Sequence, residues 1–140
     1  DVTIQAQILE LLAQLQRELN MSMILISHDL GVVARICDRA IVMYAGRVVE
    51  EAPIEALFAD PQHPYTLGLL RSIPKPGQTI EELSIIEGSP PDQRHLPPGC
   101  AFAPRCAYKI ARCEEEIPDT RFVSPGHLKR CWVDIEENSR

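Results

Sequence analysis

Four of the five cysteines lie close together near the end of the sequence, at Cys100, Cys106, Cys113 and Cys131. Four thiolates can hold a [4Fe–4S] cluster or a structural zinc ion. Zinc sites usually contain close Cys-x2-Cys pairs, and no such pair occurs here, which weakens that interpretation. A third interpretation is that the thiols bind nothing and pack a small domain. Their spacing alone leaves these alternatives open.

The segment that carries these thiols has few apolar residues. About 40 residues build little core, and such domains usually need a metal or disulfides. A structural metal contributes on the order of 10 kcal/mol, and disulfides are disfavoured in a reducing cytosol. We expect a helix over 104–116 that places Cys106 and Cys113 on one face. Cys37 stands apart, and we interpret it as a buried thiol without a role.

A second candidate for chemistry is His28, which follows the apolar run 23–26. This run predicts a buried strand, and ligands of open α/β sheets bind outside the carboxyl ends of the strands. The imidazole is therefore expected at a ligand crevice, and the segment becomes a candidate nucleotide site. The alternative is that His28 is a capping or core histidine.

The flanking residues predict the elements that would position His28. Apolar residues recur at helical steps before it, and Asp1 precedes them as a candidate N-cap; they are Ile4, Ile8, Leu11, Leu12, Leu15 and Leu19. A short helix is expected over 29–37. Strands are expected over 40–44 and 47–50, joined by a tight turn at Ala45-Gly46. This order is typical of the end of an α/β domain.

Several of these motifs resemble ABC-transporter ATPases, a family of P-loop NTPases. Asp1-Val2 and the following helix resemble the D-loop region, residues 26–30 resemble the H-loop, and residues 38–50 resemble the strand pair after it. Residues 58–67, which contain His63-Pro64-Tyr65, resemble the signature of ATPase subunits of oligopeptide and dipeptide importers. We interpret His63-Pro64-Tyr65 as structural, because proline suits the first turn of a helix.

The resemblance implies an α/β fold with four parts. Residues 1–52 form the C-terminal part of an ABC-type nucleotide-binding domain, and residues 53–73 are helical. Residues 74–96, rich in proline, form a connector with a short strand at 83–86. Residues 97–140, called the Cys-rich region below, form an irregular metal-binding extension with an acidic tail.

The resemblance also implies a function. The full-length subunit would bind ATP and Mg²⁺, pair with a sister ATPase as a homo- or heterodimer, and drive two transmembrane permease subunits that import peptide. His28 would contact the γ-phosphate as a catalytic positioning residue, and Asp1 would reach the nucleotide site across the dimer. Cys100, Cys106, Cys113 and Cys131 would hold a [4Fe–4S] cluster, with Zn²⁺ as the alternative. The peptide would not touch this chain.

Two other functions compete with this interpretation. One is the ATPase of a nickel importer, which is a close relative, and the other is a non-catalytic iron–sulfur or zinc interaction module. The sequence contains no Gly-x4-Gly-Lys motif and begins with Asp, so we expect a C-terminal fragment that does not hydrolyse ATP alone.

Composition narrows the class of protein further. The net charge is −6 and no basic stripe occurs, which argues against nucleic-acid binding. No apolar run reaches about 18 residues, so no transmembrane helix is expected. These features favour a peripheral protein on the cytoplasmic side of the membrane, attached through partner subunits.

Overall fold

The computed structural model describes residues 2–74 and 85–135. The chain divides into two compact units, residues 1–38 and residues 39–140. Each unit is described by itself below.

The first unit contains the two predicted helices. Helix α1 (Val2–Leu19) ends at Asn20, whose left-handed backbone (φ 49°) stops the helix. Helix α2 (Leu30–Ile36) begins after Asp29, whose carboxylate accepts hydrogen bonds from the backbone N–H groups of Gly31 (2.9 Å) and Val32 (3.1 Å). This N-cap satisfies two of the backbone donors that the first turn leaves without partners. Both helix predictions are confirmed.

The predicted strand at 23–26 is wrong for the structure as described. These residues have no strand pairing, and Ile24 and Ile26 are 91% and 94% exposed. A strand requires a neighbouring strand for its backbone hydrogen bonds, and none of the described residues supplies one to this run. Cys37, predicted to be buried, is only partly buried at the end of α2.

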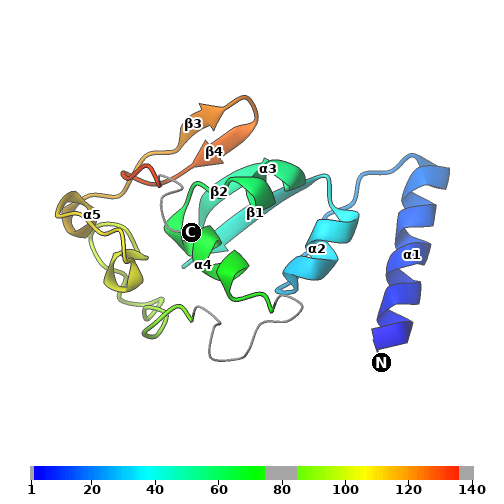
Figure 1. Ribbon diagram of the computed structural model, residues 1–140, viewed down its shortest axis with the longest axis horizontal. Helices are drawn as coiled ribbons and strands as arrows, with labels where there is room; N and C mark the ends of the chain where they lie inside the picture. Colours follow the sequence, from blue (N-terminus) through cyan, green and yellow to red (C-terminus); the bar gives the residue numbers. More distant parts are fainter. Residues whose placement is uncertain (1, 75–84, 136–140) are drawn as a thin grey trace. The chain divides into compact units, whose positions relative to one another are not determined.

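The second unit is built on a four-stranded antiparallel sheet in the order β1-β2-β4-β3 (Figure 1). Strands β1 (Arg39–Tyr44) and β2 (Arg47–Pro53) form the predicted hairpin. Its turn residues Ala45 and Gly46 both have positive φ (48° and 76°), as a two-residue hairpin turn requires. Strands β3 (Arg121–Ser124) and β4 (His127–Lys129) belong to the Cys-rich region, so this region shares one sheet with the hairpin.

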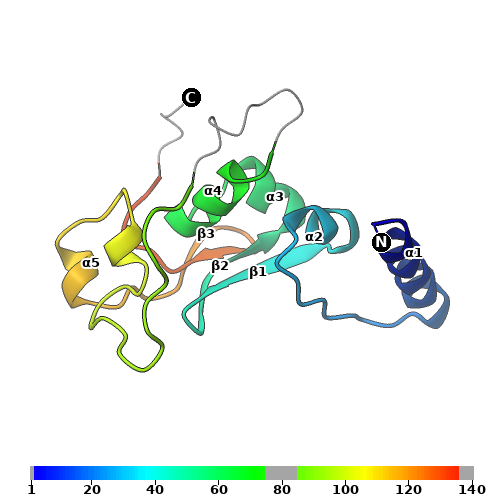
Figure 2. The ribbon, with the colours of Figure 1, turned by 90° about the horizontal axis from the view of Figure 1, so that it is seen from below.

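Helices α3 (Ile54–Ala59) and α4 (Pro64–Arg71) lie over one face of the sheet (Figure 2). The core beneath them contains Val42, Tyr44, Val49, Ala52, Leu57 and Phe102. The ring centroid of Tyr44 lies 4.7 Å from that of Tyr65 on α4 and 5.2 Å from that of Phe102, and both pairs meet edge to face. Burying a side chain such as Phe102 contributes about 1.5–3 kcal/mol. This residue therefore anchors the Cys-rich region to the core.

The helix predicted over 104–116 is wrong. The structure has a short 3₁₀ helix, η2 (Ala103–Arg105), and a single-turn helix, α5 (Arg112–Glu115). Between them Cys106 adopts an extended backbone (φ −88°, ψ 117°), which ends η2. Of the strand predicted at 83–86, residues 83 and 84 lie outside the described residues, and residues 85 and 86 are not in a strand.

Candidate functional site

Turns, instead of one helix face, position three of the four thiols of the Cys-rich region, and Cys131 follows soon after β4. The N–H of Ala103 donates to Cys100 O (3.0 Å), that of Lys109 to Cys106 O (3.3 Å), and that of Cys113 to Ile110 O (3.0 Å). Each bond closes a tight turn that begins or ends at a cysteine. The chain thus folds back on itself repeatedly around the sulfur atoms.

A close backbone contact joins the first and third cysteines. The N–H of Cys100 donates to Cys113 O at 2.8 Å. Beside it, a Cβ atom added to Gly99 would lie 2.3 Å from Cys113 O. Only glycine allows the two backbones to approach so closely.

The four thiols form one electrostatic group. Cys113 and Cys131 are buried, Cys100 and Cys106 are partly buried, and none forms a disulfide. Burial raises the pKa of Cys106 to about 11, and the other three thiols add to this shift. Burial also raises the pKa of Cys100 and of Cys131, with smaller contributions from neighbouring thiols. Every pair among the four is therefore close enough to interact.

Backbone donors surround the same sulfur atoms. The N–H of Val133 donates to Cys131 Sγ at 3.4 Å. N–H groups of residues 102 and 103 bond Cys100, and that of Tyr108 bonds Cys106, which lowers the thiol pKa against the larger effect of burial. Hydrogen bonds of this kind favour a thiolate.

The structure does not support the prediction that the four cysteines form a metal site. Within residues 2–74 and 85–135, no three His, Cys, Asp or Glu side chains are grouped as ligands of a metal ion. The described residues therefore do not support the predicted metal site. Four sulfur ligands at about 2.3 Å from a zinc ion would lie only about 3.8 Å from each other.

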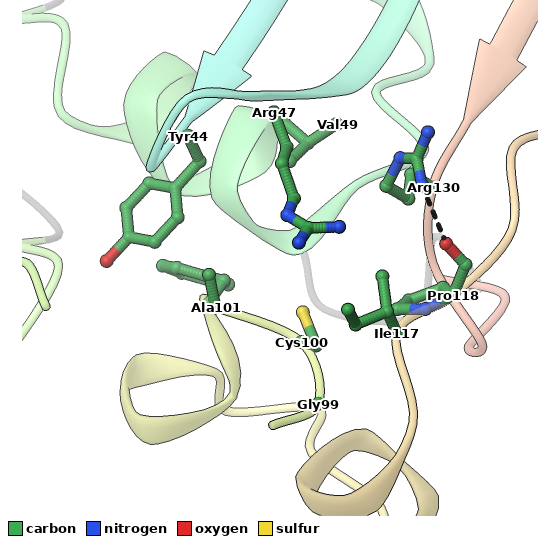
Figure 3. Close-up of a pocket in the computed structure, with 10 residues that line it drawn as sticks. Tyr44, Arg47, Val49, Gly99, Cys100, Ala101, Ile117, Pro118 and Arg130 are labelled. Carbon is green, nitrogen blue, oxygen red and sulfur yellow. Dashed lines mark hydrogen bonds between the residues drawn. The ribbon is translucent and has the colours of Figure 1, made fainter. Parts of the chain in front are cut away.

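Two hollows adjoin the thiols. A cavity of about 20 Å³ lies beside Cys100 and Phe102, with Arg47 and Arg130 across it (Figure 3). It has room for about one water molecule, so it is no ligand site. An open groove of about 690 Å³ runs between α4, residues 85–88 and residues 102–108, and Cys106 is part of its lining.

A buried polar network lies between the sheet and the start of α4, and the sequence analysis missed it. The Glu50 carboxylate is fully buried; it accepts hydrogen bonds from the backbone N–H of Gln62 (2.7 Å) and of His63 (2.9 Å). His127 Nε2 lies 2.7 Å from the same carboxylate. Glu50 and Ala52 are both buried on β2, two residues apart on one side of the strand, and no local sequence pattern marks Glu50 as buried.

His63 gives the His-Pro-Tyr motif its structural role. Its Nδ1 accepts a hydrogen bond from the N–H of Tyr65 (3.1 Å), and Pro64 occupies the first turn of α4. Burial, and then the positive charge of Lys129, lower the pKa of His63 to about 4. The neutral ring thus caps the helix, which confirms the structural interpretation of the motif.

Lys129 is the buried cation of this network. Its Nζ donates to Val133 O (2.9 Å) and Asp134 Oδ1 (2.7 Å). The hydrogen bond from Lys129 is the largest cause that lowers the pKa of Asp134. The lysine thus binds the segment after β4 back onto the sheet, next to Cys131.

His28 is exposed in the bend that precedes α2. Ser27 Oγ accepts a hydrogen bond from the N–H of Asp29 (3.0 Å), and Asp29 caps α2, so both neighbours are held while the imidazole faces solvent. The structure does not place His28 at the end of a strand. Asp1 lies outside the described residues. The predicted nucleotide residues and the cysteines belong to different units.

Comparison with known proteins identifies related sequences. Residues 49–113 match the family described as oligopeptide/dipeptide transporter, C-terminal region. The chain is 48% identical to a putative peptide import ATP-binding protein of Brucella ovis, over 96% of this chain and 42% of that protein. It is 47% identical to an oligopeptide transport ATP-binding protein of Haemophilus influenzae, over 98% of this chain and 42% of that protein.

A dipeptide transport ATP-binding protein of Bacillus subtilis is 49% identical, over 95% of this chain and 40% of that protein. The chain spans about two fifths of the length of these relatives. Among the described residues, no helix has the length and apolar character needed to cross a membrane.

Proposed function

We propose that this chain belongs to the oligopeptide/dipeptide transporter family, whose model it matches over residues 49–113, and that its full-length protein is the ATP-binding and ATP-hydrolysing subunit that drives peptide import. The observation that carries the proposal is the 47–49% identity to peptide, oligopeptide and dipeptide transport ATP-binding proteins over nearly the whole chain. The order of the D-loop, H-loop and His-Pro-Tyr motifs supports it.

His28 is the residue of this chain proposed to act on ATP. ATP bound with Mg²⁺ would supply the γ-phosphoryl group that is transferred to water. The imidazole would donate a hydrogen bond to a γ-phosphate oxygen and help to hold the attacking water. The fixed Ser27–Asp29 turn and the exposed ring support this role, because nothing among the described residues covers the imidazole. Asp1 would contact the nucleotide site across the ATPase dimer.

Replacement of His28 tests the proposal. In the full-length subunit assembled with its partners, His28→Ala is expected to lower ATP turnover roughly 100-fold or more while ATP still binds. The matched control is His95→Ala, since the His95 side chain is 83% exposed and its Nδ1 lies 3.5 Å from Asp92 Oδ2. Unchanged turnover in the His28 variant would exclude the catalytic role.

The proposed partners follow from the same family. The subunit would pair with a sister ATPase and contact two transmembrane permease subunits from the cytoplasmic side of the membrane, as a peripheral protein. Peptide would pass through those partners without touching this chain. Purification of the subunit with its permeases, and its loss from membranes when the permeases are deleted, would support this arrangement. Equal membrane recovery without the permeases would contradict it.

We also propose that Cys100, Cys106, Cys113 and Cys131 bind a [4Fe–4S] cluster, with Zn²⁺ as the alternative. The clustering of the four thiols and the backbone N–H donors around them support this proposal, and coordination would deprotonate thiols whose pKa is otherwise raised by burial. Within the described residues no three such side chains are arranged to hold a metal ion, so the proposal rests on the resemblance and on the clustering of the thiols.

Chemical analysis separates these alternatives. Protein prepared without oxygen is expected to be brown and to contain iron and acid-labile sulfide. Cys106→Ser should abolish the colour, whereas Cys37→Ser, in the other unit, should retain it. Colourless protein with stoichiometric zinc would support the zinc site, and protein without either metal would contradict both.

A further inference from the structure

The backbones of Cys100 and Cys113 are paired independently of any metal. The hydrogen bond of 2.8 Å from Cys100 N to Cys113 O holds the two Cα atoms within about 6.7 Å of each other, given standard backbone bond lengths. A disulfide requires a Cα separation of about 4.4–6.8 Å. The contact made possible by Gly99 fixes this approach. The two thiols are also close enough to interact electrostatically.

We propose that Cys100 and Cys113 form a reversible disulfide when the four thiols carry no metal and a peroxide is present. The two residues differ in access, because Cys100 is partly exposed whereas only 5% of Cys113 is exposed. Cys100 is therefore the thiol that peroxide reaches, and Cys113 is the thiol that reacts with it afterwards. The backbone bond between the two residues keeps them together while the disulfide closes.

The reaction balances with hydrogen peroxide as the oxidant. The Cys100 thiolate attacks one peroxide oxygen, the O–O bond breaks, and Cys100 sulfenic acid and one water are formed. The Cys100 thiol proton completes that first water. The Cys113 sulfur then attacks the sulfenic sulfur, the S–O bond breaks, and the leaving hydroxide takes the Cys113 thiol proton to form a second water. In total two thiols are oxidised to one disulfide and one peroxide is reduced to two waters. A dithiol reductant reverses the change by exchange.

Cys106 is the strongest competitor for this pairing. It is also partly exposed, and it lines the 690 Å³ groove. Its backbone carbonyl and N–H bond only within its own turns, to Lys109 and Ala103. No backbone bond among the described residues holds Cys106 beside Cys113 or Cys131. Pairing with Cys106 would therefore require a larger rearrangement than pairing of Cys100 with Cys113.

Peptide mapping tests the proposal on the full-length subunit. Iron is first removed with a chelator under argon and its absence verified; the protein is then treated with hydrogen peroxide, alkylated and digested without reductant. The Cys37→Ser variant is used throughout, which removes the cysteine of the other unit. We expect the protein to become about 2 Da lighter, a peptide pair linked through Cys100 and Cys113, and recovery of both thiols after reduction.

The outcomes are distinct from those of the metal analysis. A Cys100→Ser variant should lose the link, and a Cys106→Ser variant should retain it. If Cys100 or Cys113 stays reduced, or is linked mainly to Cys106 or Cys131, the proposal is overturned. Iron content before chelation is measured separately, so absence of a cluster and absence of the disulfide are independent results. If a cluster is present, the oxidised pair cannot ligate it, and the disulfide would regulate its assembly.

Discussion

His127 Nε2 and Glu50 Oε1 lie 2.7 Å apart at a position where the side chains are 3% and 0% exposed. The contact joins β4 of the Cys-rich region to β2 of the hairpin. The same carboxylate holds the backbone N–H groups of Gln62 and His63 at the start of α4. One buried side chain thus connects two hairpins and a helix.

Glu50→Gln is expected to lower the free energy of unfolding by about 3 kcal/mol. The amide replaces one acceptor oxygen by a donor, so a buried partner loses its hydrogen bond. The matched control is the neighbouring Glu51→Gln, which breaks a partly exposed ion pair with Arg39 and should cost less than about 1 kcal/mol. Urea unfolding of both variants measures the difference, and equal losses would contradict the role given to Glu50.

His63 should make stability depend on pH between about 4 and 6.5. Its pKa is lowered in the folded protein, so the unfolded chain binds the proton more readily in this range. The stabilisation is fully present above pH 6.5 and is lost as pH falls toward 4, by about 3 kcal/mol in total. The free energy of unfolding, measured at a series of pH values between 7 and 4, checks this prediction.

The control for the pH effect is His63→Asn, which retains a helix-capping side chain but does not titrate. Carboxylates change stability in both proteins, so the difference between the two pH profiles isolates the histidine. Parallel profiles from pH 7 to pH 4 would show that His63 does not titrate as described.

Lys129→Met should raise the pKa of His63 above 4 but leave it below 6.5. Burial is the larger cause of the shift and remains, while the positive charge of Lys129 is removed. Titration of the His63 ring by NMR in the wild type and in the variant measures the change. Arg94→Met, at an exposed side chain paired with Asp92, should leave the His63 pKa unchanged. A lower His63 pKa in the Lys129→Met variant would contradict the conclusion that the Lys129 charge lowers this pKa.

Gly99→Ala is expected to cost about 3 kcal/mol or more, since its Cβ would lie 2.3 Å from Cys113 O and the backbones must separate. Gly46→Ala provides the comparison. It meets nothing within 4 Å and costs only about 1 kcal/mol through its positive φ. Thermal or urea unfolding compares the variants, and a smaller loss at Gly99 than at Gly46 would refute the close packing.

Local patterns in the sequence predicted the elements that local interactions determine. The apolar period predicted α1, Ala45-Gly46 predicted the hairpin, and Pro64 predicted the first turn of α4. In each case the signal and the structure it specifies lie within a few residues of each other.

The sequence could not predict features that depend on distant residues. The strand at 23–26 failed because a strand needs a neighbour that no local pattern supplies. The helix at 104–116 failed because the seven-residue spacing of Cys106 and Cys113 also suits a series of turns. Glu50 was missed because its partner His127 follows far along the chain, in a strand that joins β2 only in the folded sheet.

The pairing of β2 with β4 has a consequence for protein engineering. In the paired register of the described strands, Glu50 faces Lys129 and Glu51 faces Leu128, and the N–H of Arg130 donates to Val49 O at 2.8 Å beyond them. A chimaera that transplants the cysteines of one relative onto another must therefore carry the β1–β2 hairpin with them. Separation of the two hairpins would expose an unpaired sheet edge that can aggregate. It would also leave the buried Glu50 carboxylate without its partner His127.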